Sequence, residues 1–182
     1  MATDRTTPAD AVGAYIAAKD GNRPYLLERA FVRDAAVTID SRTGAISFPP
    51  VLQGRTAIAD ALVRGFAQGF ENVYTFCLAA PPADDADRYA CAWLVAMSER
   101  AGGAVRVGHG RYDWTFAATG GARALTIEID GMQTMPGGDG PAVLGWAAAL
   151  PYPWCRPADA LRRAPPVPAL APILAAIGDG RS

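Results

Sequence analysis

The chain has 182 residues, 51% of them hydrophobic and 19% charged, which is ample material for a core and unlike the composition of a disordered protein. Its formal net charge of −1 provides no overall attraction for nucleic acid or for an anionic membrane surface, so we expect neither as a partner. Apolar runs are broken by glycine, proline or charge well before the roughly 20 residues that a membrane span needs.

The first part of the chain is predicted to be helical. A threonine can cap a helix that begins at Pro8, and Gly21 followed by Asn22 ends it. Along this helix an apolar stripe with helical spacing ends in the chain's one lysine, Lys19. The next expected elements, in chain order, are a short helix at 24–30, a strand at 35–40, an irregular loop or hairpin at 41–53, a helix that opens at 54–58, and strands at 73–79, 89–99, 104–117 and 125–135.

This order of elements indicates the α+β class. Helices precede four strands that are joined by short turns, and antiparallel strands accept such short connections. We expect a strongly curved, mainly antiparallel sheet with the N-terminal helices across its concave face. The enclosed cone is the expected pocket.

The composition changes after residue 135, which divides the chain into a domain at 1–135 and an extension at 136–182. The extension begins with a glycine- and proline-rich stretch at 136–141 and continues with a rigid aromatic segment at 150–155. Two short helices are expected at 157–163 and 169–177. Because the extension is rich in both proline and apolar residues, it is expected to pack on the domain or on a second subunit.

The residues give little indication of a metal or cofactor site. The three cysteines are odd in number and lack metal-ligand spacing, which favours buried thiols in a reducing compartment. The chain has one histidine, so a histidine-rich metal centre is not expected. The N-terminus lacks the order of a secretory signal, and we expect a cytoplasmic protein.

The strand at 104–117 carries the candidate site. Side chains alternate between the faces of a strand, so His109, Arg111 and Asp113 share one face. This face offers an acid, a base and a guanidinium, and we expect it to line the pocket. Large rings occupy the opposite face and the neighbouring strand; they are Trp93, Tyr112, Trp114 and Phe116. We expect these rings to form a dimer interface in preference to an aromatic ligand cage.

The chain resembles the nuclear transport factor 2-like superfamily, which includes the SnoaL-like proteins and ketosteroid isomerase. The resemblance rests on the first helix with residues 15–18, on residues 31–37 entering the first strand, and on residues 54–58 opening the third helix. It covers roughly residues 8–135. It implies a cone-shaped, cystatin-like α+β barrel, a homodimer through the sheet face, and a small apolar or carbonyl-containing ligand.

Ketosteroid isomerase also implies roles for single residues. Tyr15 falls where that enzyme has the tyrosine of its oxyanion hole, and Asp113 falls where it has the protonated aspartate, a carboxylic acid that an apolar site keeps neutral. The general base of that enzyme falls at Ile39, with Asp40 one residue later. A shift of one residue turns a strand side chain to the opposite face unless a bulge intervenes, so steroid isomerisation itself is not expected. The facing of Asp130 is left open.

Two hypotheses follow. In the first, the chain is a cofactor-independent isomerase, cyclase or dehydratase that transfers protons on a carbonyl compound. Asp113 and His109 would handle protons, and Tyr15 and Arg111 would stabilise the oxyanion. In the second, it is a non-catalytic ligand-binding or interaction module, which Ile39 favours. For single residues the structural alternatives are an Arg111–Asp113 ion pair, a histidine at the rim or satisfied in the core, and a tyrosine that only packs.

Overall fold

The computed structural model describes residues 6–180. Residues 1–5, on which the expected lack of a secretory signal partly rests, lie outside the described residues. The elements are α1 (Pro8–Gly21), a 3₁₀ turn (Pro24–Leu26), α2 (Leu27–Ala30), β1 (Phe31–Ser41), β2 (Val51–Gln53), α3 (Arg55–Ile58), a π-helical turn (Ala59–Gly65), α4 (Phe66–Gly69), β3 (Phe70–Cys77), β4 (Arg88–Glu99), β5 (Val105–Phe116), β6 (Ala122–Met135), a 3₁₀ turn (Gly137–Asp139), α5 (Gly140–Ala148), α6 (Pro157–Arg162), a 3₁₀ turn (Pro168–Leu170) and α7 (Ala171–Gly178).

Local sequence explains where α1 begins and ends. The Thr7 side chain accepts a hydrogen bond from the Asp10 backbone N–H, and the Asp10 carboxylate accepts one from the Thr7 N–H, which makes a capping box. At the other end Asn22 adopts a left-handed conformation with φ of 50°, which asparagine tolerates better than most residues. The predicted helix is therefore confirmed with nearly its predicted ends.

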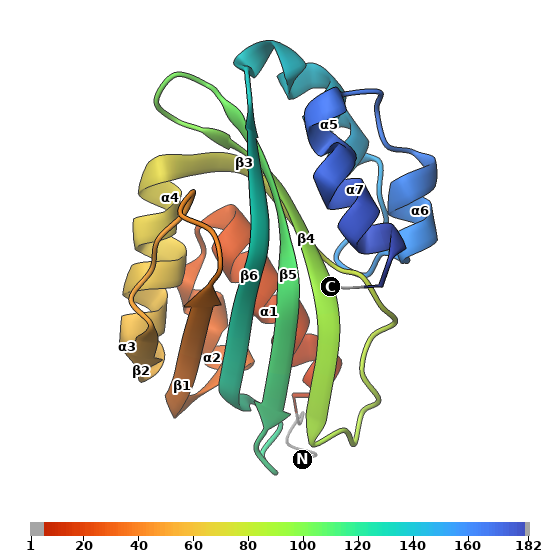
Figure 1. Cartoon of the computed structure of the whole chain (residues 1–182). Coiled ribbons are helices and arrows are strands. Elements are labelled where there is room, and N and C mark those ends of the chain that lie inside the picture. Colours follow the sequence, from red (N-terminus) through yellow and green to blue (C-terminus); the bar gives the residue numbers. More distant parts are fainter. Residues whose placement is uncertain (1–5, 181–182) are drawn as a thin grey trace.

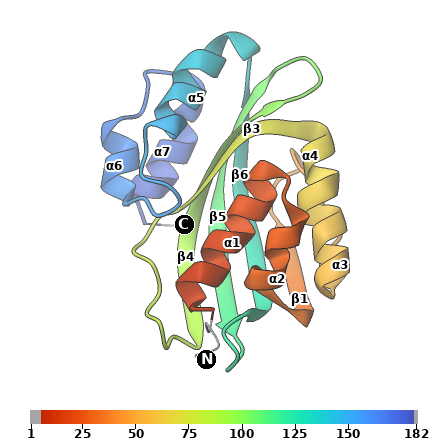
Figure 2. The ribbon, with the colours of Figure 1, turned by 180° about the vertical axis from the view of Figure 1, so that it is seen from behind.

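Six strands form one curved sheet in the order β2-β1-β6-β5-β4-β3. The β1 and β6 strands run parallel and the other neighbours run antiparallel. Helices α1 to α4 lie across the concave face of the sheet (Figure 2). The predicted α+β class with a mainly antiparallel, cone-forming sheet is confirmed. The loop expected at 41–53 contains one short strand, β2, which pairs with β1.

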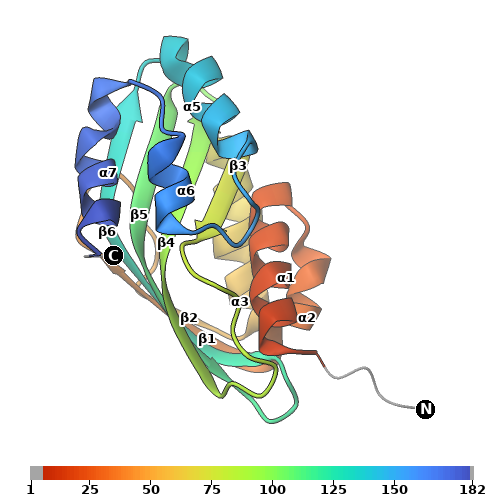
Figure 3. The ribbon, with the colours of Figure 1, turned by 90° about the vertical axis from the view of Figure 1, so that its right-hand side faces the viewer.

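The extension lies on the opposite side of the sheet. Helices α5, α6 and α7 cover the upper part of the convex face, so the sheet has a helical layer on each side (Figure 1 and Figure 3). Each layer has its own core: Tyr15, Phe31 and Trp114 belong to the core of the concave side, whereas Trp146, Leu170 and Ile173 belong to that of the convex side. No helix among residues 6–180 is both long enough and apolar enough to span a membrane.

Candidate functional site

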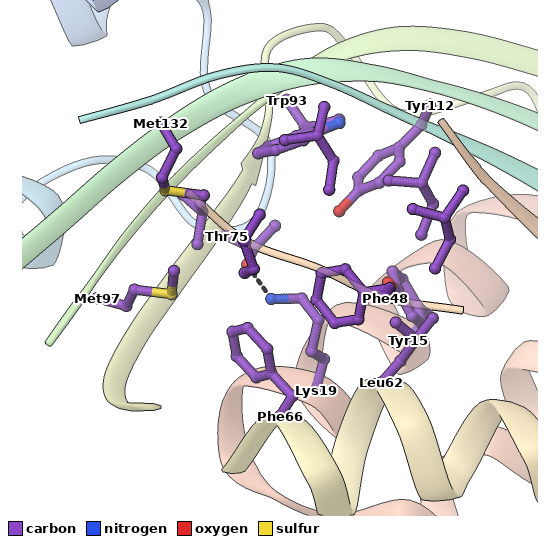
Figure 4. A pocket seen from close by; sticks show the side chains of 15 residues that line it. Tyr15, Lys19, Phe48, Leu62, Phe66, Thr75, Trp93, Met97, Tyr112 and Met132 are labelled. Atoms are coloured by element: carbon purple, nitrogen blue, oxygen red, sulfur yellow. Dashed lines mark hydrogen bonds between the residues drawn. The ribbon is translucent and has the colours of Figure 1, made fainter. Parts of the chain in front are cut away.

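A cavity lies inside the cone, between the concave face of the sheet and the helices that cover it. Its volume is ≈ 50 Å³. The wall is largely apolar; strand residues that line it include Ile39, Trp93, Met97, Ile127 and Met132 (Figure 4). This volume is well below the roughly 300–1,000 Å³ of most ligand pockets, so a ligand here must be very small or must displace part of the wall, and the apolar lining favours an apolar body.

The loop at 42–50 closes one side of the cavity. Ile46 and Phe48 of this loop, together with Phe66, line both the cavity and a second, shallower groove at the surface. The Phe48 and Phe66 rings stack with centroids 6.5 Å apart. The loop is thus the layer that separates the cavity from this surface groove.

One charged side chain enters the cavity. Lys19, at the end of α1, is 8% exposed, and its Nζ donates to Asp20 Oδ1 at 3.1 Å. It also donates to Thr75 Oγ1 at 2.8 Å (Figure 4). Its Nζ also lies 4.6 Å from the centre of the Phe66 ring, within the range of a cation–π contact. An ammonium group carries three N–H donors, so two protein acceptors in the described part of the chain leave one donor for a ligand.

The partner carboxylate of Asp20 is fully hydrogen-bonded. Besides Lys19, its Oδ1 accepts from Thr75 Oγ1 at 2.7 Å, and its Oδ2 accepts from the Thr75 backbone N–H at 2.7 Å and from Tyr152 Oη at 2.9 Å. A carboxylate has about four lone-pair sites, and four donors occupy them. Asp20 therefore holds Lys19 in place, and its hydrogen-bonding capacity is used within the protein.

Two phenol groups add neutral donors to the cavity wall. Tyr15 lies on α1 and Tyr112 on β5, and their ring centroids are 6.2 Å apart. Burial raises the pKa of Tyr15, and the nearby Asp20 charge raises it further, while a hydrogen bond with Tyr112 offsets part of this effect. Burial likewise raises the pKa of Tyr112. Both phenols are therefore protonated at neutral pH, and because one O–H is used in the hydrogen bond between them, the pair has one O–H left to donate to a ligand.

The predicted facing of three site residues is wrong. Asp113 lies on the convex face with 42% of its side chain exposed, 3.3 Å from Arg88. Arg111 is exposed on the same face and does not line the cavity. The alternation along the strand was predicted correctly, but its polar side faces outward because the large rings of the other side gain more from burial. Of the expected site residues, Tyr15 alone lines the cavity.

His109 is buried under the convex face and also lies outside the cavity. The pairing of β5 with β6 shifts here: His109 is opposite Gly131 and Gly110 is opposite Ile129, so Asp130 is the extra residue of a bulge. The His109 Nδ1 atom is buried and finds no hydrogen-bond partner among residues 6–180. Burial lowers the pKa of His109, and the Asp130 charge opposes this shift.

The rings expected at a dimer interface line the inside of the cone instead. Trp93 and Tyr112 stack with centroids 5.7 Å apart, and Trp114 packs edge-on against Tyr15 at 5.4 Å. The upper convex face, where such an interface was expected, carries the helices of the extension (Figure 1). The homodimer remains a prediction that these rings do not support.

The two residues at the expected position of the general base, Ile39 and Asp40, face in the directions that the sequence predicts. Ile39 lines the cavity, whereas Asp40 points away from it and lies 3.9 Å from Arg42. Asp130 also points outward, with Oδ1 accepting from Arg42 at 3.0 Å. No carboxylate or imidazole belongs to the cavity lining within residues 6–180, and no cluster of potential metal ligands occurs there.

The polar group that the structure does place in the cavity was missed. The signal for it was Lys19, the one lysine of the chain, at the end of an apolar helical stripe. Thr75, which binds Lys19, and Tyr152, which binds the adjacent Asp20, are distant in sequence and carry no motif.

Solved structures with the same architecture share only low sequence identity with the chain. A protein from Catenulispora acidiphila with a ketosteroid isomerase-like fold, in complex with trimethylamine, superposes with a TM-score of 0.53 at 19% identity, over 67% of this chain and 85% of that one. A nuclear transport factor 2-like protein from Burkholderia thailandensis superposes with a TM-score of 0.53 at 14% identity, over 68% of this chain and 91% of that one. The chain has the nuclear transport factor 2-like fold.

Another protein with this fold contains a larger ligand. A Mycobacterium tuberculosis protein in complex with estradiol-17beta-hemisuccinate superposes with a TM-score of 0.54 at 12% identity, over 66% of this chain and 92% of that one. In each of these superpositions about a third of this chain is unmatched, whereas 85%, 91% and 92% of the other three chains are matched. No protein-family model and no curated protein sequence matches the chain.

Proposed function

We propose that the chain binds a small, mostly apolar ligand in the cavity and holds a hydrogen-bond acceptor of that ligand at Lys19 Nζ. The remaining N–H of this buried ammonium carries the proposal. The hydrogen-bonded phenols of Tyr15 and Tyr112 add one further donor. A ligand with an apolar body and one acceptor oxygen complements such a wall.

Binding is favoured over catalysis by the lack of a base. The side chain at the position of the family's general base is Ile39, and the Asp20 carboxylate is occupied by four donors. Two similar structures are complexes with a small molecule, trimethylamine or estradiol-17beta-hemisuccinate, so proteins of this fold can bind small molecules.

The proposal is tested with two ligands of matched shape. Cyclopentanone has a carbonyl oxygen where methylenecyclopentane has a CH₂ group. A hydrogen bond to a charged donor contributes about 1.5–3 kcal/mol. Lys19→Met should therefore lower the affinity for cyclopentanone by about tenfold or more relative to the affinity for methylenecyclopentane. Affinities are measured by NMR titration, with Arg64→Met, an exposed cation outside the cavity, as the control. If neither ligand binds the unmodified protein, the proposal is wrong.

A catalytic alternative is proton transfer on a carbonyl compound, in which a water molecule takes the α-proton while Lys19 and Tyr15 stabilise the enolate oxygen. The convergence of an ammonium and neutral phenols on one cavity favours it. This activity would appear as deuterium exchange at the α-carbons of cyclopentanone in D₂O, lost in Lys19→Met. Binding of cyclopentanone with exchange at the rate of the buffer identifies a binding protein instead.

A further inference from the structure

The extension reaches around one edge of the sheet. Residues 151–155 run along β3, the last strand in the sheet order, and pair with it at one position. The Cys77 N–H donates to Pro153 O at 2.8 Å, and the Cys155 N–H donates to Cys77 O at 2.9 Å. We call residues 151–155 the edge segment.

Side chains of the edge segment enter both cores. Trp154 packs against the concave core, with its ring 6.2 Å from that of Tyr89, whereas Cys155 is buried in the convex core. The Tyr152 ring packs edge-on against Phe76 at 5.8 Å. These contacts fix the edge segment, and with it the direction of the Tyr152 side chain.

The hydroxyl group of Tyr152 reaches the polar group of the cavity. It donates to Asp20 Oδ2 at 2.9 Å, across 132 positions of sequence. This bond, with that from the Thr75 backbone N–H, occupies Oδ2 and leaves Oδ1 to Lys19 and the Thr75 hydroxyl. Without the Tyr152 hydroxyl, Oδ2 would have a vacant lone pair close to the Lys19 ammonium.

We propose that Tyr152 is a positioning residue for the ligand site. By occupying Asp20 Oδ2 it prevents the third N–H of Lys19 from turning to the carboxylate, and so keeps this donor directed at the cavity. The inference rests on the proposed function, because the ligand acceptor is the group that uses the donor. It makes the extension a functional part of the site.

The experiment removes only the hydroxyl group. Tyr152→Phe keeps the ring that packs on Phe76, and Tyr25→Phe, at a tyrosine that is 71% exposed and outside the cavity, is the matched control. We expect Tyr152→Phe to lower the affinity for cyclopentanone by about threefold to tenfold and to leave the affinity for methylenecyclopentane unchanged. The reason is that the substitution redirects one N–H donor of Lys19 and does not change the residues that line the cavity.

A second measurement observes Lys19 without any ligand. Since the chain has one lysine, ¹³C-labelled lysine gives a single Cε signal, which should shift in Tyr152→Phe and not in Tyr25→Phe. An unchanged signal, or an equal loss of affinity for both ligands, would overturn the inference. A shifted signal in a protein that binds neither ligand would support the positioning role and overturn the proposed function.

Discussion

A double-mutant cycle on Lys19 and Asp20 tests whether the pair acts as a buried ionic unit. The variants are Lys19→Met, Asp20→Asn and the double variant. At 3.1 Å and an effective dielectric constant of about 20, two unit charges attract by about 5 kcal/mol before desolvation is subtracted. Their side chains are 9% and 6% exposed, so each single variant leaves a charge that water hardly reaches.

Desolvation removes part of this attraction. Breaking a buried pair from one side costs about 3–5 kcal/mol, whereas removing both charges together costs much less. We therefore expect each single variant to lose about 3 kcal/mol of unfolding free energy and the double variant to lose less than their sum, with a coupling of about 2 kcal/mol or more. The hydrogen bonds from Thr75 and Tyr152 to residue 20 can persist in Asp20→Asn.

Urea unfolding followed by tryptophan fluorescence measures the four stabilities. The control is the same cycle on Arg64 and Asp60, which are equally close at 2.9 Å but have side chains that are 55% and 65% exposed. That pair should couple by less than about 1 kcal/mol. Additive losses at Lys19 and Asp20, or a coupling no larger than that of the exposed pair, would refute the reasoning.

The remaining predictions concern residues outside the cavity. Asp113→Asn should change stability by less than about 0.5 kcal/mol and leave ligand affinity unchanged, since its ion pair is exposed; calorimetry and titration check this. Gly110→Ala should lower the unfolding free energy by about 2 kcal/mol, because its Cβ would lie 1.9 Å from the Glu128 carbonyl oxygen; denaturant titration against the parent protein measures the loss. Because burial lowers the pKa of His109, the unfolded chain binds a proton first, so stability should fall below about pH 6.5 by up to about 1.4 kcal/mol per pH unit; a His109→Gln variant with the same slope would contradict this. The three buried cysteine thiols should react with a thiol reagent only after unfolding, as absorbance with and without urea will show.

The overall fold could be predicted because its signals are local. Capping at Thr7, the asparagine after α1 and the short turns between the last strands each follow from neighbouring residues. The curvature and the cone follow from the order of these elements. A deviation in the helical region is the start of β1, which begins at Phe31 directly after α2.

The site was harder to predict because facing is not a local property. Alternation shows that Asp113 and Tyr112 lie on opposite faces of β5 but not which face is inside. The burial of four large rings should have decided the matter, since such rings bury far more apolar area than the polar set. His109 is buried although it lies on the convex side of β5, which blurs the difference between the two faces.

The polar group of the cavity depends on contacts between distant parts of the chain. Lys19 reaches Thr75 over 56 positions, and Asp20 reaches Tyr152 over 132. No spacing rule connects such residues, and only the folded sheet brings them together. The single informative sign was a lone lysine among apolar neighbours.

The edge segment has a consequence for how the protein behaves at high concentration. A sheet with an open border can recruit strands from other molecules and so nucleate aggregates. Here one border is β2, only three residues long, and the other is occupied near Cys77 by the edge segment. Truncation before residue 151 would uncover that second border, and the shortened protein should self-associate through β3.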